Sequence, residues 1–209
     1  MDKAVIFDMD GTLFDTERIY RSSWLETGVP VELYRRFIGR SAESISGMLK
    51  DAGFDPEETV ARKKALVVKK LEKGIPVKPG AAEAVDGLHR AGIITAIATS
   101  TAMETAVSYL ERTGFAGRFD RVISGNRLPN GKPAPDIFLM TAKELGVSPE
   151  HCVVVEDSEN GVRAGHAAGM LTLMVPDMVP PDEELRSLCG GVLDSLSDLI
   201  PWLTRAGWL

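Results

Sequence analysis

Two aspartates separated by a single residue, Asp8 and Asp10, are the residues of this chain whose spacing most clearly predicts chemistry. They follow the apolar run Ala4–Phe7, which predicts a buried strand. A carboxylate is costly to bury without a partner, so the pair needs a cation, a proton or a ligand. Residues i and i+2 of a strand point the same way, so one carboxylate could act as nucleophile and the other as proton donor. A strand that ends in an ordinary Asp-Gly turn is the alternative interpretation.

A run of hydroxyl side chains, Thr99-Ser100-Thr101, follows the predicted strand Ile93–Ala98 and precedes a predicted helix. Hydroxyls and free backbone N–H groups at a helix N-terminus can bind an anion. A helix cap made by one of these residues explains the run equally well.

Lys132 lies between Gly131 and Pro133, just before another predicted helix. Proline restricts the backbone on one side of the lysine, which suits a fixed point charge against a phosphate oxygen. The alternative is a lysine in a surface loop.

The adjacent acids Glu156 and Asp157 end the apolar run Cys152–Val155. Together with Asp8 they could offer oxygen ligands to a hard cation such as Mg²⁺, which shares its coordination with waters and phosphate oxygens. A helix N-cap formed by Asp157 or Ser158 is the alternative.

Alternating strand and helix patterns predict the fold that carries these sites. The alternation implies an α/β fold with a mostly parallel, Rossmann-like sheet covered by helices on both faces. Ligands bind such sheets at the carboxyl ends of the strands, where all four sites lie. The predicted strands are Lys3–Phe7, Ile93–Ala98, Arg121–Ser124, Cys152–Val155 and Leu171–Met174, with a weaker pattern at Gly191–Leu193. The predicted helices are Ala81–Ala91, Met103–Arg112, Pro135–Leu145, Gly161–Ala168 and Leu196–Ala206.

Residues 16–77 break the alternation, because they contain helical patterns and no convincing strand. We therefore expect an all-helical cap domain at 16–77, inserted into a catalytic core made of residues 1–15 and 78–209. Its predicted helices are Thr16–Glu26, Pro30–Phe37, Ala42–Ala52 and Pro56–Lys73.

The composition of the chain argues against several kinds of partner and location. The net charge of −6 argues against a nucleic-acid partner and against a basic membrane contact. No apolar run reaches the length of about 18 residues that a transmembrane helix needs. Two cysteines and the lack of an export signal favour a cytoplasmic location. The oligomeric state does not follow from the sequence, and a monomer is compatible with it.

The four motifs together resemble those of the haloacid dehalogenase-like hydrolase superfamily, and they occur in its order. The opening segment Phe7–Glu17, the segment Lys132–Asp136 and the run Glu156–Ser158 resemble the β-phosphoglucomutase-like branch, which has a helical cap at the position of the insertion. The resemblance covers nearly the whole chain. It implies a phosphoryl-transfer enzyme and leaves the substrate open.

The resemblance also implies a role for each core motif. Asp8 would be the nucleophile that forms an aspartyl-phosphate, and Asp10 would protonate the leaving group and then activate water. Thr99 and Lys132 would hold the phosphoryl oxygens, assisted by the backbone of Met9 and Ser100. Mg²⁺ would be bound by Asp8, the Asp10 carbonyl oxygen and Asp157, with Glu156 as a ligand or close neighbour.

The insertion departs from the members of the branch that isomerise a sugar phosphate. Tyr20 stands where they have a histidine, and Ala42 matches their arginine, although a shift of one or two residues would bring Arg40 into that position. Lys63 matches their cap lysine, so Tyr20 and Lys63 are expected to bind substrate.

Because part of the cap residues that the mutases share is missing here, the resemblance favours a Mg²⁺-dependent phosphatase. Its substrate would be a small phosphorylated metabolite, either a sugar phosphate or a nucleotide. A phosphosugar mutase is the enzymatic alternative. A non-catalytic sensor of phosphate ligands is a third hypothesis, which the intact acid pair disfavours.

Overall fold

The structure is a computed structural model that describes residues 2–38, 40 and 42–209 of the chain. It divides into two compact units. One contains the residues up to Asp15 together with Pro76–Leu209, and the other is Thr16–Ile75. The helical segment therefore ends slightly earlier in the chain than the expected boundary at residue 77.

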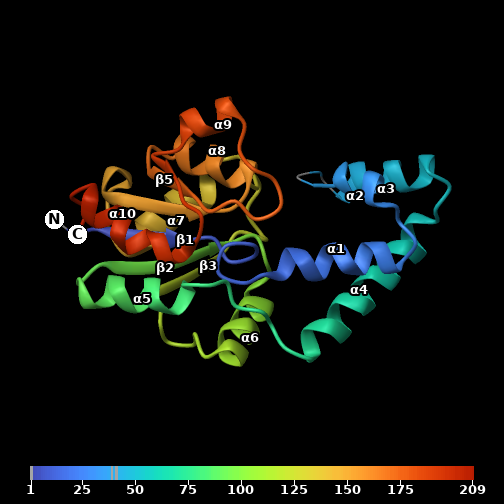
Figure 1. The fold of residues 1–209 in the computed structure, drawn as a ribbon, viewed down its shortest axis with the longest axis horizontal. Helices are drawn as coiled ribbons and strands as arrows, with labels where there is room; N and C mark the ends of the chain where they lie inside the picture. Colours follow the sequence, from blue (N-terminus) through green and yellow to red (C-terminus); the bar gives the residue numbers. More distant parts are fainter. Residues whose placement is uncertain (1, 39, 41) are drawn as a thin grey trace. The chain divides into compact units, whose positions relative to one another are not determined.

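A six-stranded sheet with the order β3-β2-β1-β4-β5-β6 forms the centre of the first unit (Figure 1), and its paired strands are all parallel. The first strand of the sequence lies in the middle, between β2 and β4, and the chain winds outward from it in both directions. This order confirms the predicted α/β, Rossmann-like fold. The strands are β1 Ala4–Phe7, β2 Ile94–Thr99, β3 Arg121–Ser124, β4 Cys152–Glu156, β5 Leu171–Met174 and β6 Gly191–Val192.

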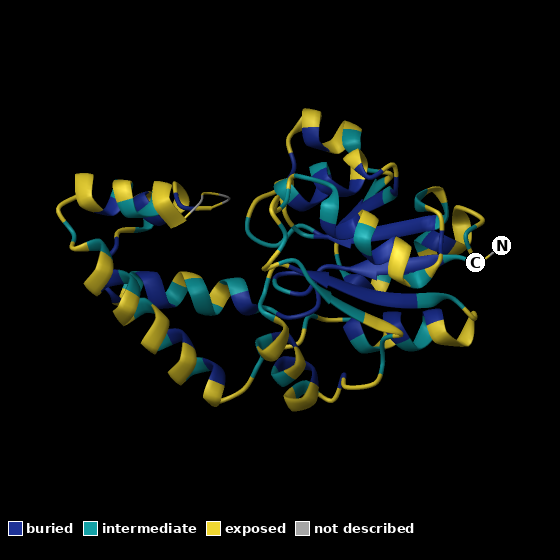
Figure 2. Ribbon diagram, turned by 180° about the vertical axis from the view of Figure 1, so that it is seen from behind, coloured by how far each residue is buried: buried dark blue, intermediate teal, exposed yellow. Residues whose placement is uncertain are grey.

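The central strands β1 and β4 are buried along their whole length, as expected for continuous apolar strands (Figure 2). Ala4 and Ile6 belong to a core cluster with Phe138 of α7 and Ala164 of α8. The rings of Phe7 and Phe119 meet edge to face, with their centres 6.1 Å apart. Helix α5 packs against β2. The helices of this unit are α5 Ala81–Arg90, α6 Met103–Thr113, α7 Asp136–Leu145, α8 Glu159–Ala167, α9 Glu183–Leu188 and α10 Leu199–Arg205.

Two features of this unit differ from the sequence prediction. Helix α9 was not expected, because six residues that follow Pro180 and Pro181 are too few for a clear helical period. The predicted helix Leu196–Ala206 is a 3₁₀ turn, Leu196–Asp198, followed by α10. Pro201 has no N–H group, so it is tolerated only near the start of α10.

The two chain segments that flank the helical unit are hydrogen-bonded to each other within the α/β unit. The Lys78 amide donates to the Leu13 carbonyl oxygen at 2.9 Å, and the Asp15 amide donates to the Pro76 carbonyl oxygen at 2.8 Å. The Lys78 ammonium also forms a buried ion pair with Asp177, at 2.5 Å. These contacts fix both ends of the inserted segment beside the loop that follows β1.

The described residues of the second unit form four helices: α1 Thr16–Glu26, α2 Val31–Arg35, α3 Ala42–Asp51 and α4 Pro56–Glu72. Helix α1 packs along α4, and the ring centres of Trp24 and Phe37 lie 5.1 Å apart. Helix α4 starts with Pro56 in its first turn, and the Asp55 side chain accepts a hydrogen bond from the Glu58 amide. No strand occurs among the described residues of this unit, in agreement with the predicted all-helical insertion.

Candidate active site

Asp8 follows β1, in the middle of the sheet, and its side chain is buried. One carboxylate oxygen accepts a hydrogen bond from the Lys132 ammonium at 2.5 Å, and the Asp8 amide donates to the Val155 carbonyl oxygen of β4. Burial raises the pKa of Asp8, and the Lys132 ammonium opposes this rise. The carboxylate is thus held at the carboxyl end of the central strand by a neighbouring cation and by the pairing of β1 with β4.

Lys132 bridges Asp8 and Glu156, whose oxygens lie 2.5 and 2.6 Å from its Nζ. The ammonium also lies 3.3 Å from the Ala98 carbonyl oxygen and over the ring of Phe138. Burial alone lowers the pKa of Lys132, but the two carboxylates outweigh this effect and raise it above the ordinary value. Because only 9% of its side chain is exposed, Lys132 is a buried cation and the surface-loop interpretation is wrong.

Glu156 ends β4 and is 1% exposed. One of its oxygens accepts from Lys132, and the other accepts from the amides of Asp157 and Ser158 and from the Ser158 hydroxyl, at 3.0 to 3.1 Å. A Cβ atom on Gly161, in the first turn of α8, would overlap the Glu156 carboxylate. Ser158 also caps α8, as the alternative interpretation proposed, by accepting from the Gly161 amide. Ser158 therefore both caps α8 and donates hydrogen bonds to the Glu156 carboxylate.

Asp157 is held by the loop that follows β1. The Thr12 hydroxyl donates to one of its oxygens at 3.1 Å. Gly11 has φ +90° and passes so close to the Asp157 carboxylate that a side chain there would overlap it. Thr12 was not predicted as a site residue, although it belongs to the motif around Asp8.

Asp8, Glu156 and Asp157 each offer a ligand atom, and these atoms lie within 4.8 Å of one another. Three carboxylates with a single ammonium group among them carry excess negative charge, and oxygen donors of this kind suit a hard divalent cation. The donor set therefore fits Mg²⁺. Both oxygens of Glu156 already accept hydrogen bonds, so Asp8 and Asp157 are the better placed ligands.

Asp10 lies beside the hydroxyl run that ends β2. The Thr101 hydroxyl donates to an Asp10 carboxylate oxygen at 2.7 Å, and the Thr101 amide donates to the Thr99 hydroxyl at 3.0 Å. Helix α6 has Ala102 as its N-cap and no side-chain cap bond, so the cap interpretation of this run is wrong. Thr99 is buried, whereas Ser100 is exposed. Met9, whose backbone was expected to assist, has a buried side chain.

The site residues predicted in the insertion lie together in the helical unit. The Lys63 ammonium of α4 lies 4.5 Å from the ring centre of Tyr20 and 5.4 Å from that of Trp24, both on α1. Burial lowers the pKa of Lys63. Trp24 was not predicted, although its spacing of four from Tyr20 places both rings on one helix face. The predicted counterpart of the mutase arginine lies in Gly39–Ala42, where residues 39 and 41 are outside the described residues.

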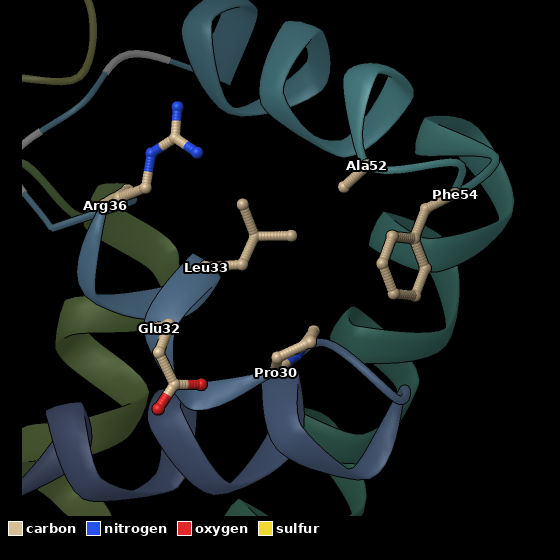
Figure 3. Close-up of a pocket in the computed structure, with 6 residues that line it drawn as sticks. All are labelled: Pro30, Glu32, Leu33, Arg36, Ala52 and Phe54. Atoms are coloured by element: carbon tan, nitrogen blue, oxygen red, sulfur yellow. The ribbon is translucent and has the colours of Figure 1, made fainter.

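A separate cavity of about 330 Å³ occurs in the helical unit (Figure 3). It is open and mainly apolar, and it contains none of the predicted site residues. We assign it no role. Its lining residues are Pro30, Glu32, Leu33, Arg36, Ala52 and Phe54. Across the described parts of both units, no helix is long and apolar enough to cross a membrane.

Comparison with known proteins identifies similar hydrolases. A family model described as haloacid dehalogenase-like hydrolase matches residues 3–169. A protein of Thermotoga maritima named phosphorylated carbohydrates phosphatase is 36% identical over 180 residues, which cover 80% of this chain and 82% of that protein.

Solved structures agree with this result over the whole fold. The crystal structure of CbbY from Rhodobacter sphaeroides in complex with phosphate has a TM-score of 0.78 and 30% identity, and the match covers 95% of this chain and 96% of that one. A structure from Thermotoga maritima provisionally named a β-phosphoglucomutase has a TM-score of 0.82 and 28% identity, covering 98% and 99% of the two chains.

The contact between Gly161 and Glu156 gives a test of the site's packing. We expect Gly161→Ala to displace the Glu156 carboxylate from Lys132, to lower the free energy of unfolding by about 1–3 kcal/mol and to reduce turnover. Urea unfolding and a phosphatase assay measure the two effects.

Gly47→Ala is the matched control, because Gly47 is also helical and has open space where a Cβ would be added. It should leave turnover unchanged and stabilise the protein by up to about 1 kcal/mol. Equal behaviour of the two variants would show that the Glu156 carboxylate is free to move.

Proposed function

The chain belongs to the haloacid dehalogenase-like hydrolase family, and we propose that it is a Mg²⁺-dependent phosphatase that hydrolyses a small phosphorylated carbohydrate through an aspartyl-phosphate. The observation that carries the proposal is the buried Asp8 carboxylate held by Lys132 at the end of the central strand, with Asp10 two residues further on. A protein that only binds phosphate has no need of a buried carboxylate in this position, which disfavours the sensor hypothesis.

In the proposed first step an Asp8 oxygen attacks phosphorus and the bond from phosphorus to the ester oxygen breaks. The departing oxygen takes a proton from the Asp10 carboxyl group. In the second step Asp10 accepts a proton from water, the water oxygen attacks phosphorus, the bond from phosphorus to the Asp8 oxygen breaks, and inorganic phosphate leaves. Asp8 is then again a carboxylate, and Asp10 is again a protonated carboxyl group.

The remaining core residues stabilise the phosphoryl group in this proposal. Lys132 offers a positive charge beside Asp8 for a phosphoryl oxygen. The Thr99 hydroxyl oxygen accepts a hydrogen bond from the Thr101 amide, which leaves the Thr99 hydroxyl proton for a phosphoryl oxygen. The amides of Met9 and Ser100 are the further donors in this proposal. Mg²⁺, held by Asp8, Asp157 and the Asp10 carbonyl oxygen beside Glu156, would neutralise the charge that otherwise repels an anionic substrate from an anionic nucleophile.

The substrate class rests on the relatives. The Thermotoga maritima relative is named for phosphorylated carbohydrates, which supports a sugar phosphate as the substrate. Tyr20 and Lys63 stay predicted substrate-binding residues. The β-phosphoglucomutase name of one similar structure supports a phosphosugar mutase as the alternative function.

The nucleophile is tested with Asp8→Asn. We expect a folded protein with less than about one-thousandth of the wild-type turnover, because the amide cannot form the acyl-phosphate. The fold should survive, since Glu156 still neutralises Lys132. Turnover of p-nitrophenyl phosphate and circular dichroism are the measurements.

Asp51→Asn, at an exposed position on α3, is the control for removal of a carboxylate and should keep full turnover. A folded Asp8→Asn protein that retains about a tenth of the wild-type rate would refute the assignment.

Metal dependence is the second test. Removal of divalent ions with a chelator should abolish turnover, Mg²⁺ should restore it, and Ca²⁺ should inhibit, because Ca²⁺ accepts more ligands in looser geometry. Mg²⁺ should also raise the melting temperature of the wild type, and less so that of Asp157→Asn. Full activity in excess chelator contradicts the proposal.

The third test distinguishes a phosphatase from a mutase. The protein is given β-glucose 1-phosphate with a trace of glucose 1,6-bisphosphate, and inorganic phosphate and glucose 6-phosphate are both measured. We expect inorganic phosphate to be the main product, because Tyr20 replaces the histidine of the mutases. Much faster accumulation of glucose 6-phosphate than of inorganic phosphate would establish the mutase instead.

A further inference from the structure

We propose that Thr101 is a positioning residue that orients the Asp10 carboxyl group for proton transfer to the leaving oxygen. This inference rests on the proposed function, because it assigns Thr101 to the acid–base step of that reaction. Thr101 follows β2 and Asp10 follows β1, so a hydroxyl from one strand end contacts the carboxylate of the next.

The contact is a short hydrogen bond, at 2.7 Å from the Thr101 hydroxyl to an Asp10 oxygen. A hydroxyl can both donate and accept. It can therefore donate to the Asp10 carboxylate and accept from the protonated carboxyl group. A threonine at this position suits a residue that must act first as acid and then as base.

Thr101 is itself fixed on two sides. Its amide donates to the Thr99 hydroxyl at 3.0 Å, and its carbonyl oxygen accepts from the Ser124 hydroxyl at 2.6 Å. Ser124 ends β3, which pairs with β2. The backbone of Thr101 is thus held by the ends of two strands, although Thr101 belongs to neither.

The Thr101 hydroxyl has no role in capping α6, because the N-cap is Ala102. This bond to Asp10 joins residues 91 positions apart in the chain. Proton transfer is sensitive to the distance and angle between donor and acceptor, so a carboxyl group that can rotate loses efficiency. We therefore expect loss of the hydroxyl to impair proton donation more than folding.

The test compares two substrates that differ in their leaving groups. Phenolate leaves poorly without a proton, whereas p-nitrophenolate leaves well. We measure the release of phenol from phenyl phosphate and of p-nitrophenol from p-nitrophenyl phosphate in a single turnover. The enzyme is in excess over the substrate, at a concentration high enough to bind all of it. Only formation of the aspartyl-phosphate is then observed.

Thr101→Val should slow phenol release by about thirtyfold and p-nitrophenol release by less than about threefold. Thr101→Ser should restore phenol release to within about threefold of the wild type. Thr113→Val is the matched control, because the Thr113 hydroxyl bonds only backbone carbonyl oxygens within α6, and it should match the wild type with both substrates.

Equal losses with both substrates, or no loss with phenyl phosphate, would overturn the role of Thr101 while leaving the phosphatase in place. If the wild type releases neither product, the proposed function fails and this inference fails with it. Should Thr101→Val not fold, Thr101→Ala is measured by the same comparison.

Discussion

Burial of two carboxylates against one ammonium group is the constraint on which the rest of the structure depends. Asp8 and Glu156 are almost completely removed from water, and Lys132 lies within 2.6 Å of both. A buried ion pair is tolerated only when its other lone pairs are satisfied. This explains why Asp157 and Ser158 donate their amides to Glu156, and why Gly161 has no side chain.

The sheet topology brings these groups together from distant parts of the sequence. The central position of β1 places Asp8 between the ends of β2 and β4, so Thr99 and Glu156 lie on either side of it. Lys132 reaches the same point from the loop between β3 and α7. The four sequence motifs thus lie close together, because all the paired strands are parallel and their carboxyl ends share an edge of the sheet.

The sequence predicts the strands well, because runs such as Val153–Val155 are apolar without interruption and end at charged residues. For the same reason it predicts that Asp8, Thr99 and Glu156 lie at the ends of β1, β2 and β4, whereas the catalytic roles of these residues stay predictions. It does not predict that Lys132 pairs with Glu156, since this depends on the path of the loop from Gly125 to Pro135. The contact of Thr101 with Asp10 was also missed, because the direction of a hydroxyl at a strand end is set by its neighbours in space. Helix α9 was missed because its period is too short to detect.

The helical unit contributes a different kind of chemistry. Lys63 lies over the rings of Tyr20 and Trp24, an arrangement that fixes an ammonium group by its attraction to aromatic faces. Imidazoles titrate near neutral pH, whereas phenols as a class titrate far above it. Tyr20 is a phenol where the mutases have an imidazole, and its ring can hold a cation or pack against a sugar ring. In the proposed mechanism Asp10 therefore carries the proton transfers, and water is the only further acceptor that the phosphoryl group on Asp8 needs. Hydrolysis is the outcome that this division of roles favours.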